Sequence, residues 1–169
     1  MIKRPRIRMN FRELLFILLT LLWCAVIFAF SAQKADDSTK TSSGVIYLFC
    51  RFVVSGFKDL DDAERYAMIA SMQFWVRKAA HFVVYFVLGI LGLQIFLAAD
   101  RPQGRRACCL SATGLCIFYA VSDEVHQYFV PGRACQLRDI CIDTLGAAVG
   151  ILLSAAVMKL IDIRRSKKA

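Results

Sequence analysis

The sequence lacks several features on which a functional assignment usually rests. It has no internal repeat, no low-complexity tract and no CxxC pair, and it holds only two histidines and three prolines among 169 residues. Its seven cysteines are odd in number, and most lie within apolar runs, where cysteine acts as a small core residue. The adjacent Cys108 and Cys109 therefore indicate neither a zinc site nor a redox site. Cys50 and Cys135 fall on one predicted side of a membrane and could pair in an oxidising compartment.

Apolar residues, by contrast, are abundant. They make up 58% of the chain, and the mean hydropathy of +0.53 exceeds that of ordinary soluble proteins. Four apolar segments, at 14–30, 79–99, 107–122 and 140–161, approach or exceed the roughly 17 to 25 residues needed to cross a hydrocarbon core. The third segment is short, so we expect it to continue through "DEVHQYFV" until Pro131 and Gly132 break the helix.

The predicted fold is therefore an all-α membrane protein, a single domain over residues 1–169 with a bundle of four transmembrane helices. The helices are expected at about 14–30, 79–99, 107–129 and 139–161. Basic residues before the first segment also suit a cleaved signal peptide. However, its apolar run is too long and no small-x-small cleavage site follows, which favours a retained anchor.

The charge distribution predicts the orientation of the chain. With four crossings, one side carries 13 basic and 3 acidic residues, or +10, and the other side carries 9 basic and 10 acidic residues, or −1. The positive-inside rule places the first side, with both termini, in the cytoplasm. Basic clusters beside membrane helices favour contact with anionic lipid over nucleic acid. The 13 basic residues are Lys3, Arg4, Arg6, Arg8, Arg12, Arg101, Arg105, Arg106, Lys159, Arg164, Arg165, Lys167 and Lys168.

The one long connection, residues 31–77, lies on the predicted outer side. It opens with a polar run, "SAQKADDSTKTSSG", and then becomes apolar over Val45 to Phe57. This apolar part is too short to span a membrane and contains Arg51, so we predict an interfacial or re-entrant segment. The aspartates of "KDLDDAERYAM" suit the start of a helix that continues into the second span, with Phe74 and Trp75 as a headgroup-level anchor.

Ionisable residues gather at the outer ends of three spans. A charge within a membrane costs about 2.5 to 3.5 kcal/mol at the helix centre and less near the interface, so these groups must face protein, water or a ligand. Helical spacing brings Asp123 toward His126 and Asp139 toward Asp143, and Ser31 and Gln33 at the end of the first span reach the same level. The second span supplies residues spaced i, i+3 and i+7, namely Lys78, His81 and Tyr85.

Several of these residues also have a purely structural interpretation. Arg77 fits a snorkelling anchor. Arg133 could satisfy carbonyl groups at a turn or pair with a carboxylate, and Asp139 could cap a helix. His126 could be an ordinary interface histidine. What predicts a site is the joint occurrence of four carboxylates, two histidines and several cations in one layer, because a merely structural network of this kind has a large desolvation cost.

The same residues resemble the VanZ-like family of bacterial membrane proteins. The resemblance rests on "KAAHFVVY", on "DEVHQYFVPGR" followed by Asp139 and Gly146, and on the serine-rich exit of the first span, "IFAFSAQKADDSTKTSS". It implies a protein of the bacterial cell membrane, in a family linked through its founding member to resistance against the lipoglycopeptide teicoplanin. The family usually has Asn where this chain has Asp143.

Two functions of different kinds follow from this sequence. The first is an enzyme at the outer leaflet acting on a lipid headgroup or a lipid-linked wall precursor, with Asp123, Glu124, His81 and His126 as the acid and base groups. Its binding residues would be Lys78, Tyr85, Gln127, Arg133 and Asp139. The second is a non-catalytic protein that binds the same headgroups or a lipoglycopeptide. No nucleophile decides between them.

Metal binding is a third possibility, because the Asp-x-x-His spacing of Asp123 and His126 is a weak ligand pattern. We assign no residue as a metal ligand, and the sequence identifies no cofactor. A transporter is less attractive, since the charges cluster at one face and not at the bilayer midplane.

Overall fold

The protein is built from five α-helices. The computed structural model describes residues 9–99 and 104–167, and within these ranges it contains no strand. Four of the helices are long and apolar enough to cross a membrane, namely α1, α3, α4 and α5. The predicted all-α membrane architecture with four spans is confirmed. The helices are α1 (Phe11–Ser31), α2 (Ala35–Val53), α3 (Asp62–Ala98), α4 (Arg105–Tyr128) and α5 (Leu137–Ser166).

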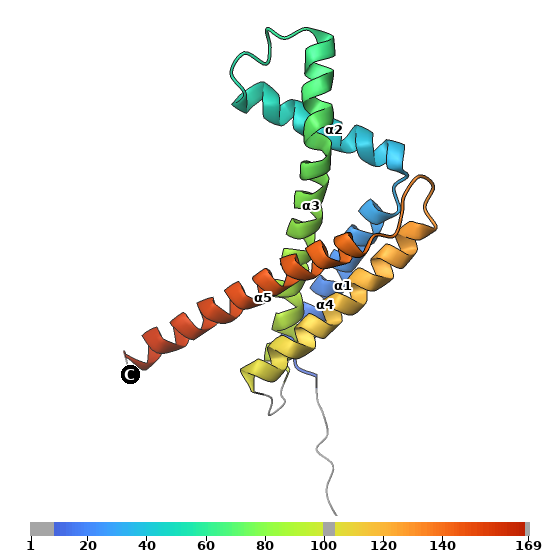
Figure 1. The fold of residues 1–169 in the computed structure, drawn as a ribbon. Helices are drawn as coiled ribbons and strands as arrows, with labels where there is room; N and C mark the ends of the chain where they lie inside the picture. The colour runs from blue at the N-terminus through green and yellow to red at the C-terminus, as the bar shows by residue number, and fades with distance from the viewer. Residues whose placement is uncertain (1–8, 100–103, 168–169) are drawn as a thin grey trace, which may run out of the picture.

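The spans run alternately between two ends of the molecule (Figure 1). At one end, the Asn10 side chain donates to the carbonyl of Ala98 at 2.6 Å, and Arg105 pairs with Asp162 at 2.6 Å. These contacts join the start of α1 to the end of α3, and the start of α4 to the end of α5. The opposite end, called the distal end here, holds the α1–α2 turn and the α4–α5 connection. These two segments lie side by side, because Ala35 donates its backbone N–H to the Pro131 carbonyl.

Local signals fix where the helices begin and end. Asn10 caps α1 by accepting from the Glu13 amide, and Asp61 forms a capping box with Glu64 at the start of α3. The helix α4 continues past the apolar run to Tyr128, three residues before Pro131. Gly132 then turns the chain with φ of 76°, a conformation that glycine adopts without steric cost.

Glycines set the distance between α3 and α5. A Cβ atom on Gly146 or Gly150 would collide with the carbonyl oxygen of Phe82 or Phe86, and one on Gly89 would collide with that of Ala147. Small residues allow this close approach of helix backbones in membranes. Because Gly146 lies against Phe82, the neighbouring turn brings Asp143 of α5 next to His81 of α3. The glycine contact therefore positions part of the ionisable cluster.

The connection from residue 31 to residue 77 differs from the expectation in one respect. The sequence predicted no secondary structure for its polar run, but this run forms the first half of α2, which continues through the apolar segment as far as Val53. Ile46 and Cys50 of α2 are buried in a cluster with Phe57, to which Met68 and Met72 of α3 contribute. The helix therefore lies across the distal half of α3 (Figure 1).

The long helix α3 carries both a membrane span and the support for α2. The expected helical continuation into the second span is confirmed, because α3 runs without interruption for 37 residues. At 1.5 Å per residue this is about 55 Å, well beyond a 30 Å hydrocarbon core. Below α2, the four spans enclose a core around Tyr85, Leu88 and Cys116. The thiols of Cys50 and Cys135 are both free, Cys50 being buried and Cys135 exposed.

Candidate functional site

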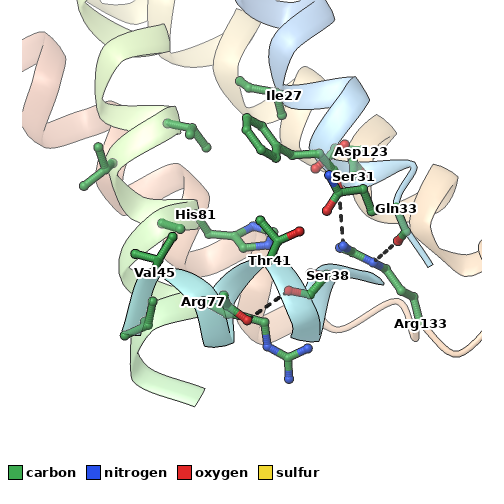
Figure 2. Close-up of a pocket in the computed structure, with 16 residues that line it drawn as sticks. Ile27, Ser31, Gln33, Ser38, Thr41, Val45, Arg77, His81, Asp123 and Arg133 are labelled. Carbon is green, nitrogen blue, oxygen red and sulfur yellow. Dashed lines mark hydrogen bonds between the residues drawn. The ribbon is translucent and has the colours of Figure 1, made fainter. Parts of the chain in front are cut away.

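A cavity of about 360 Å³ opens at the distal end, between α1, α2, α3 and the end of α4. Figure 2 shows side chains from these separate elements gathered around one space. Its deeper wall is apolar and includes Ile27, Val83 and Val84. Its polar wall combines hydroxyl groups with charged and titratable side chains. These polar residues are Ser31, Gln33, Ser38, Thr41, Ser42, Arg77, His81, Asp123 and Arg133.

Arg133 holds the distal end of α1 in place. Its Nε donates to the Gln33 carbonyl at 2.9 Å, and one terminal nitrogen donates to the Phe30 carbonyl at 3.2 Å, as the dashed lines in Figure 2 show. The Phe30 carbonyl lies in the last turn of α1, where it also accepts from the Gln33 amide at 3.3 Å, and the Gln33 carbonyl lies just beyond the helix end. Of the two roles left open by the sequence, Arg133 therefore takes the first, because it satisfies carbonyl groups and is linked to a carboxylate only indirectly.

That indirect link passes through Gln127. The other terminal nitrogen of Arg133 donates to Gln127 Oε1 at 3.1 Å, and Gln127 Nε2 donates to Asp123 Oδ2 at 3.1 Å. Asp123 is only 4% exposed, yet it lines the cavity. Among the described residues, its Oδ1 accepts no hydrogen bond. One amide side chain thus separates a partly buried guanidinium group from a buried carboxylate, and each retains hydrogen-bonding capacity.

Arg77 places a second guanidinium beside the cavity. Burial lowers the pKa of Arg133 from its ordinary value, and the positive charge of Arg77 lowers it further, whereas Asp123, Glu124 and Asp139 act in the opposite direction. Both arginines line the same cavity, Arg77 being exposed and Arg133 partly buried. Within the part of the chain that the structure describes, Arg77 makes no hydrogen bond or ion pair. Its guanidinium group is therefore available to an anion in the cavity.

His81 connects the cavity to a buried carboxylate behind it. Its Nδ1 lies 3.2 Å from Oδ1 of Asp143, which is fully buried on α5, and the imidazole itself lines the cavity. A carboxylate at Nδ1 fixes the orientation of an imidazole and leaves Nε2 available. The second oxygen of Asp143 is buried without a hydrogen-bond partner among the described residues. The arrangement can therefore exchange protons with a bound molecule.

Glu124 does not line the cavity and has a structural contact. Its Oε2 accepts from the backbone N–H of Gln136 at 2.8 Å, at the N-cap position of α5, and the side chain is fully buried. Its other oxygen has no partner among the residues described. Glu124 is absent from the lining of the cavity, so the structure brings it near the predicted site without exposing it to the same space.

Lys78 and Asp139 form a largely buried ion pair with each other between α3 and α5. Neither lines the cavity, because Lys78 lies on the α5 side of α3, over the ring of Phe74. The exposed Arg138 packs over the same ring. The pair therefore fastens the distal ends of two spans, and the predicted contact of these residues with a ligand stays a prediction.

Tyr85 and His126 lie apart from the cavity lining. Tyr85 is fully buried in the core one turn deeper than His81, and His126 packs on the ring of Phe28 with 4.5 Å between ring centroids. Tyr85 Oη and His126 Nε2 have no hydrogen-bond partner within residues 9–99 and 104–167. Of the nine predicted site residues, His81, Asp123 and Arg133 line the cavity, and Gln127 supports two of them.

Sequence reasoning missed the contribution of α2 and assigned Arg77 differently. Ser38, Thr41, Ser42 and Val45 line the cavity at helical spacing i, i+3, i+4 and i+7, which is the signal of one helix face. This signal could have been found once the polar run was taken as a helix. Arg77 was interpreted as an anchor, but it lines the cavity. Ser31 and Gln33 were expected at the same level as the ionisable cluster, and both line the cavity together with Asp123 and Arg133.

The donor set does not form a metal centre in the described chain. Within residues 9–99 and 104–167, no group of three or more His, Cys, Asp or Glu side chains is arranged to hold a metal ion. The expected Asp123 and His126 pair is divided, since His126 packs against α1 while Asp123 lines the cavity.

The site and the fold together define an integral membrane protein whose spans enclose a polar cavity near one end. The model of the VanZ/LLP1 family matches residues 16–159, which include all of α3 and α4, most of α1 and α5, and every residue of the cavity. The chain belongs to this family, as its sequence motifs indicate. Neither a curated protein nor a solved structure matches the chain.

Proposed function

We propose that this membrane protein binds the phosphate-bearing headgroup of an envelope lipid, or of a lipid-linked wall precursor, in the distal cavity. The observation that carries the proposal is that two arginines, Arg77 and Arg133, line the same cavity. Guanidinium groups match phosphate geometry well. The apolar wall formed by Ile27, Val83 and Val84 suits the first carbons of an attached lipid chain.

Charge asymmetry supports an outward-facing site in the cytoplasmic membrane of a bacterium. The end that carries the termini has a sequence charge of +10, and the distal side has −1. By the positive-inside rule, the cavity would then open toward the outer leaflet, where lipid-linked wall precursors and lipoglycopeptides are found. Binding such headgroups could alter susceptibility to teicoplanin.

Substitution of Arg77 tests the proposal directly. We expect Arg77→Gln to lower the affinity of the purified protein for phosphatidylglycerol in neutral detergent about tenfold, because one charge-assisted contact is lost. Its thermal stability should not fall, since Arg77 has no hydrogen bond or ion pair within the described residues. Arg106→Gln removes an equal charge at the other end, at an exposed residue without a hydrogen bond or ion pair among the described residues, and serves as the control. Equal lipid affinity of the Arg77 variant and the wild type would contradict the proposal.

A second function, acid–base catalysis on the bound headgroup, is favoured by the contact between His81 and Asp143. The imidazole could accept a proton from a water molecule, as expected of a general base held by a buried carboxylate. Lipid profiles of cells carrying His81→Asn or wild type, at equal abundance, separate this function from simple binding. A lipid species that changes only with the intact histidine would show turnover. Identical profiles together with retained lipid binding would indicate a binding protein.

A further inference from the structure

The cavity also contains a negative charge that the anion site does not explain. Asp123 is 96% shielded from solvent, lines the cavity and has one oxygen that accepts no hydrogen bond among the described residues. A carboxylate inside a membrane protein is costly unless a positive charge or hydrogen-bond donors satisfy it. Asp123 and Arg133 do not pair directly, because Gln127 stands between them and contacts both.

We infer that the ligand carries a primary ammonium group next to its phosphate, so that the headgroup is zwitterionic, as in an aminoalkyl phosphate lipid. The inference rests on the proposed function and adds a second point of recognition to it. The phosphate lies between Arg77 and Arg133, and the ammonium group donates to the free oxygen of Asp123. Only the amide side chain of Gln127 separates Arg133 from Asp123. A ligand that contacts both residues therefore needs only a short spacer between its phosphate and its amine.

The other polar groups of the cavity fit the same ligand. Thr41 donates its hydroxyl hydrogen to a carbonyl in α2, which leaves its oxygen as an acceptor. The Oγ of Ser31 is buried without a partner within the described chain. An ammonium group has three donors and no acceptor, so it can use such hydroxyl oxygens together with a carboxylate. A headgroup that ends in a neutral polyol, by contrast, would leave the charge of Asp123 unpaired.

Lipid affinities measured by native mass spectrometry on the whole chain in neutral detergent test the inference. The probes are phosphatidylethanolamine, phosphatidylglycerol and N-acetylated phosphatidylethanolamine with identical acyl chains. We expect phosphatidylethanolamine to bind about tenfold more tightly than either of the others, which corresponds to one charge-assisted hydrogen bond. Because these three probes compare ligands on the unaltered protein, the result does not depend on the folding of a variant.

Two variants then assign the preference to particular residues. Asp123→Asn should abolish the preference for phosphatidylethanolamine while retaining the affinity for phosphatidylglycerol, whereas Arg77→Gln should weaken both lipids alike. Equal binding of all three probes by the wild type, or an unchanged preference in Asp123→Asn, would overturn the inference but leave the phosphate site intact. If none of the probes binds, the proposed function fails as well.

A competition experiment distinguishes a lipid ligand from a free solute with the same headgroup chemistry. Soluble phosphoethanolamine should fail to displace phosphatidylethanolamine even at a hundredfold higher concentration, because it lacks the contacts with Ile27, Val83 and Val84. Displacement at an equal concentration would overturn the assignment to a lipid and point to the free aminoalkyl phosphate.

Discussion

Arg133 has two roles in the structure. It connects elements of the distal end by hydrogen bonds, and it contributes a positive charge to the cavity. It donates to Gln33, Phe30 and Gln127, and it lies in the connection between α4 and α5, so it ties α1 to α4 at the rim of the cavity. Such a fork of donors in one plane is a property of arginine and not of lysine. The residue therefore cannot be replaced merely by another positive charge.

Arg133→Lys keeps the charge and loses this fork. We expect the variant to unfold in detergent with a free energy lower by about 2 kcal/mol, since hydrogen bonds from charged donors contribute about 1.5 to 3 kcal/mol each and lysine can retain only some of them. Thermal unfolding followed by circular dichroism would measure this. Arg51→Lys, at an exposed arginine of α2 with no hydrogen bond or ion pair among the described residues, is the matched control. An unfolding temperature equal to that of the wild type would show that the carbonyl contacts are dispensable.

The ion pair of Lys78 and Asp139 is expected to act on stability and not on ligand binding. Lys78→Met alone should destabilise the protein by about 2 kcal/mol, because it removes the close partner of a buried carboxylate and leaves only Arg138, at 4.0 Å. The double variant with Asp139→Leu should recover most of this loss. Lipid affinity of the double variant, measured at a temperature where it is folded, should equal that of the wild type. A tenfold loss there would instead assign the pair to the binding site, as the sequence predicted.

Among the helices, the contact of α3 with α5 controls the geometry of the site. Gly146→Ala should lower the free energy of unfolding by about 1 to 3 kcal/mol, because the new Cβ meets the rigid backbone carbonyl of Phe82. It should also weaken lipid binding, since Asp143 lies one turn from Gly146 and His81 lies next to Phe82. Gly114→Ala adds the same methyl group to α4 in open space and should be neutral or slightly stabilising. Similar losses in both variants would refute this role of the contact.

The helices could be predicted from sequence to different extents, for physical reasons. The four spans are dictated by apolar length, and the continuation of α3 by the aspartates at its start and the absence of a break. The first half of α2 could not be predicted, because its polar residues have no strong preference. Its helical state depends on the burial of Ile46 and Cys50 against α3, which is a contact between segments distant in sequence.

The site was partly predictable for a similar reason. Neighbouring residues on a helix point about 100° apart, so the sequence places Arg77 and Lys78 at the same depth but cannot tell which one faces a cavity. The contact of Gly146 with Phe82 decides this by fixing the side of α3 that meets α5. Lys78 then reaches Asp139, and Arg77 faces the cavity. His126 is likewise turned toward Phe28 by the position of α1.

For the whole molecule, the proposed orientation makes opposite ends accessible from opposite sides of the membrane. The exposed Cys135 lies in the α4–α5 connection at the distal end, and Ser166 lies at the end of α5. In intact cells, a membrane-impermeant maleimide should label wild type more than Cys135→Ser. A cysteine introduced by Ser166→Cys in the Cys135→Ser chain should react only after the cells are permeabilised. The reverse pattern would place the termini outside.

The size of the cavity has a consequence for hydration. Its volume of about 360 Å³ is large enough to hold several water molecules. Seating a headgroup would return most of them to bulk solvent, so the binding equilibrium should respond to the activity of water. Excluded osmolytes such as sucrose should then tighten lipid binding, and exchange of one lipid for another should proceed through a cavity that water transiently refills.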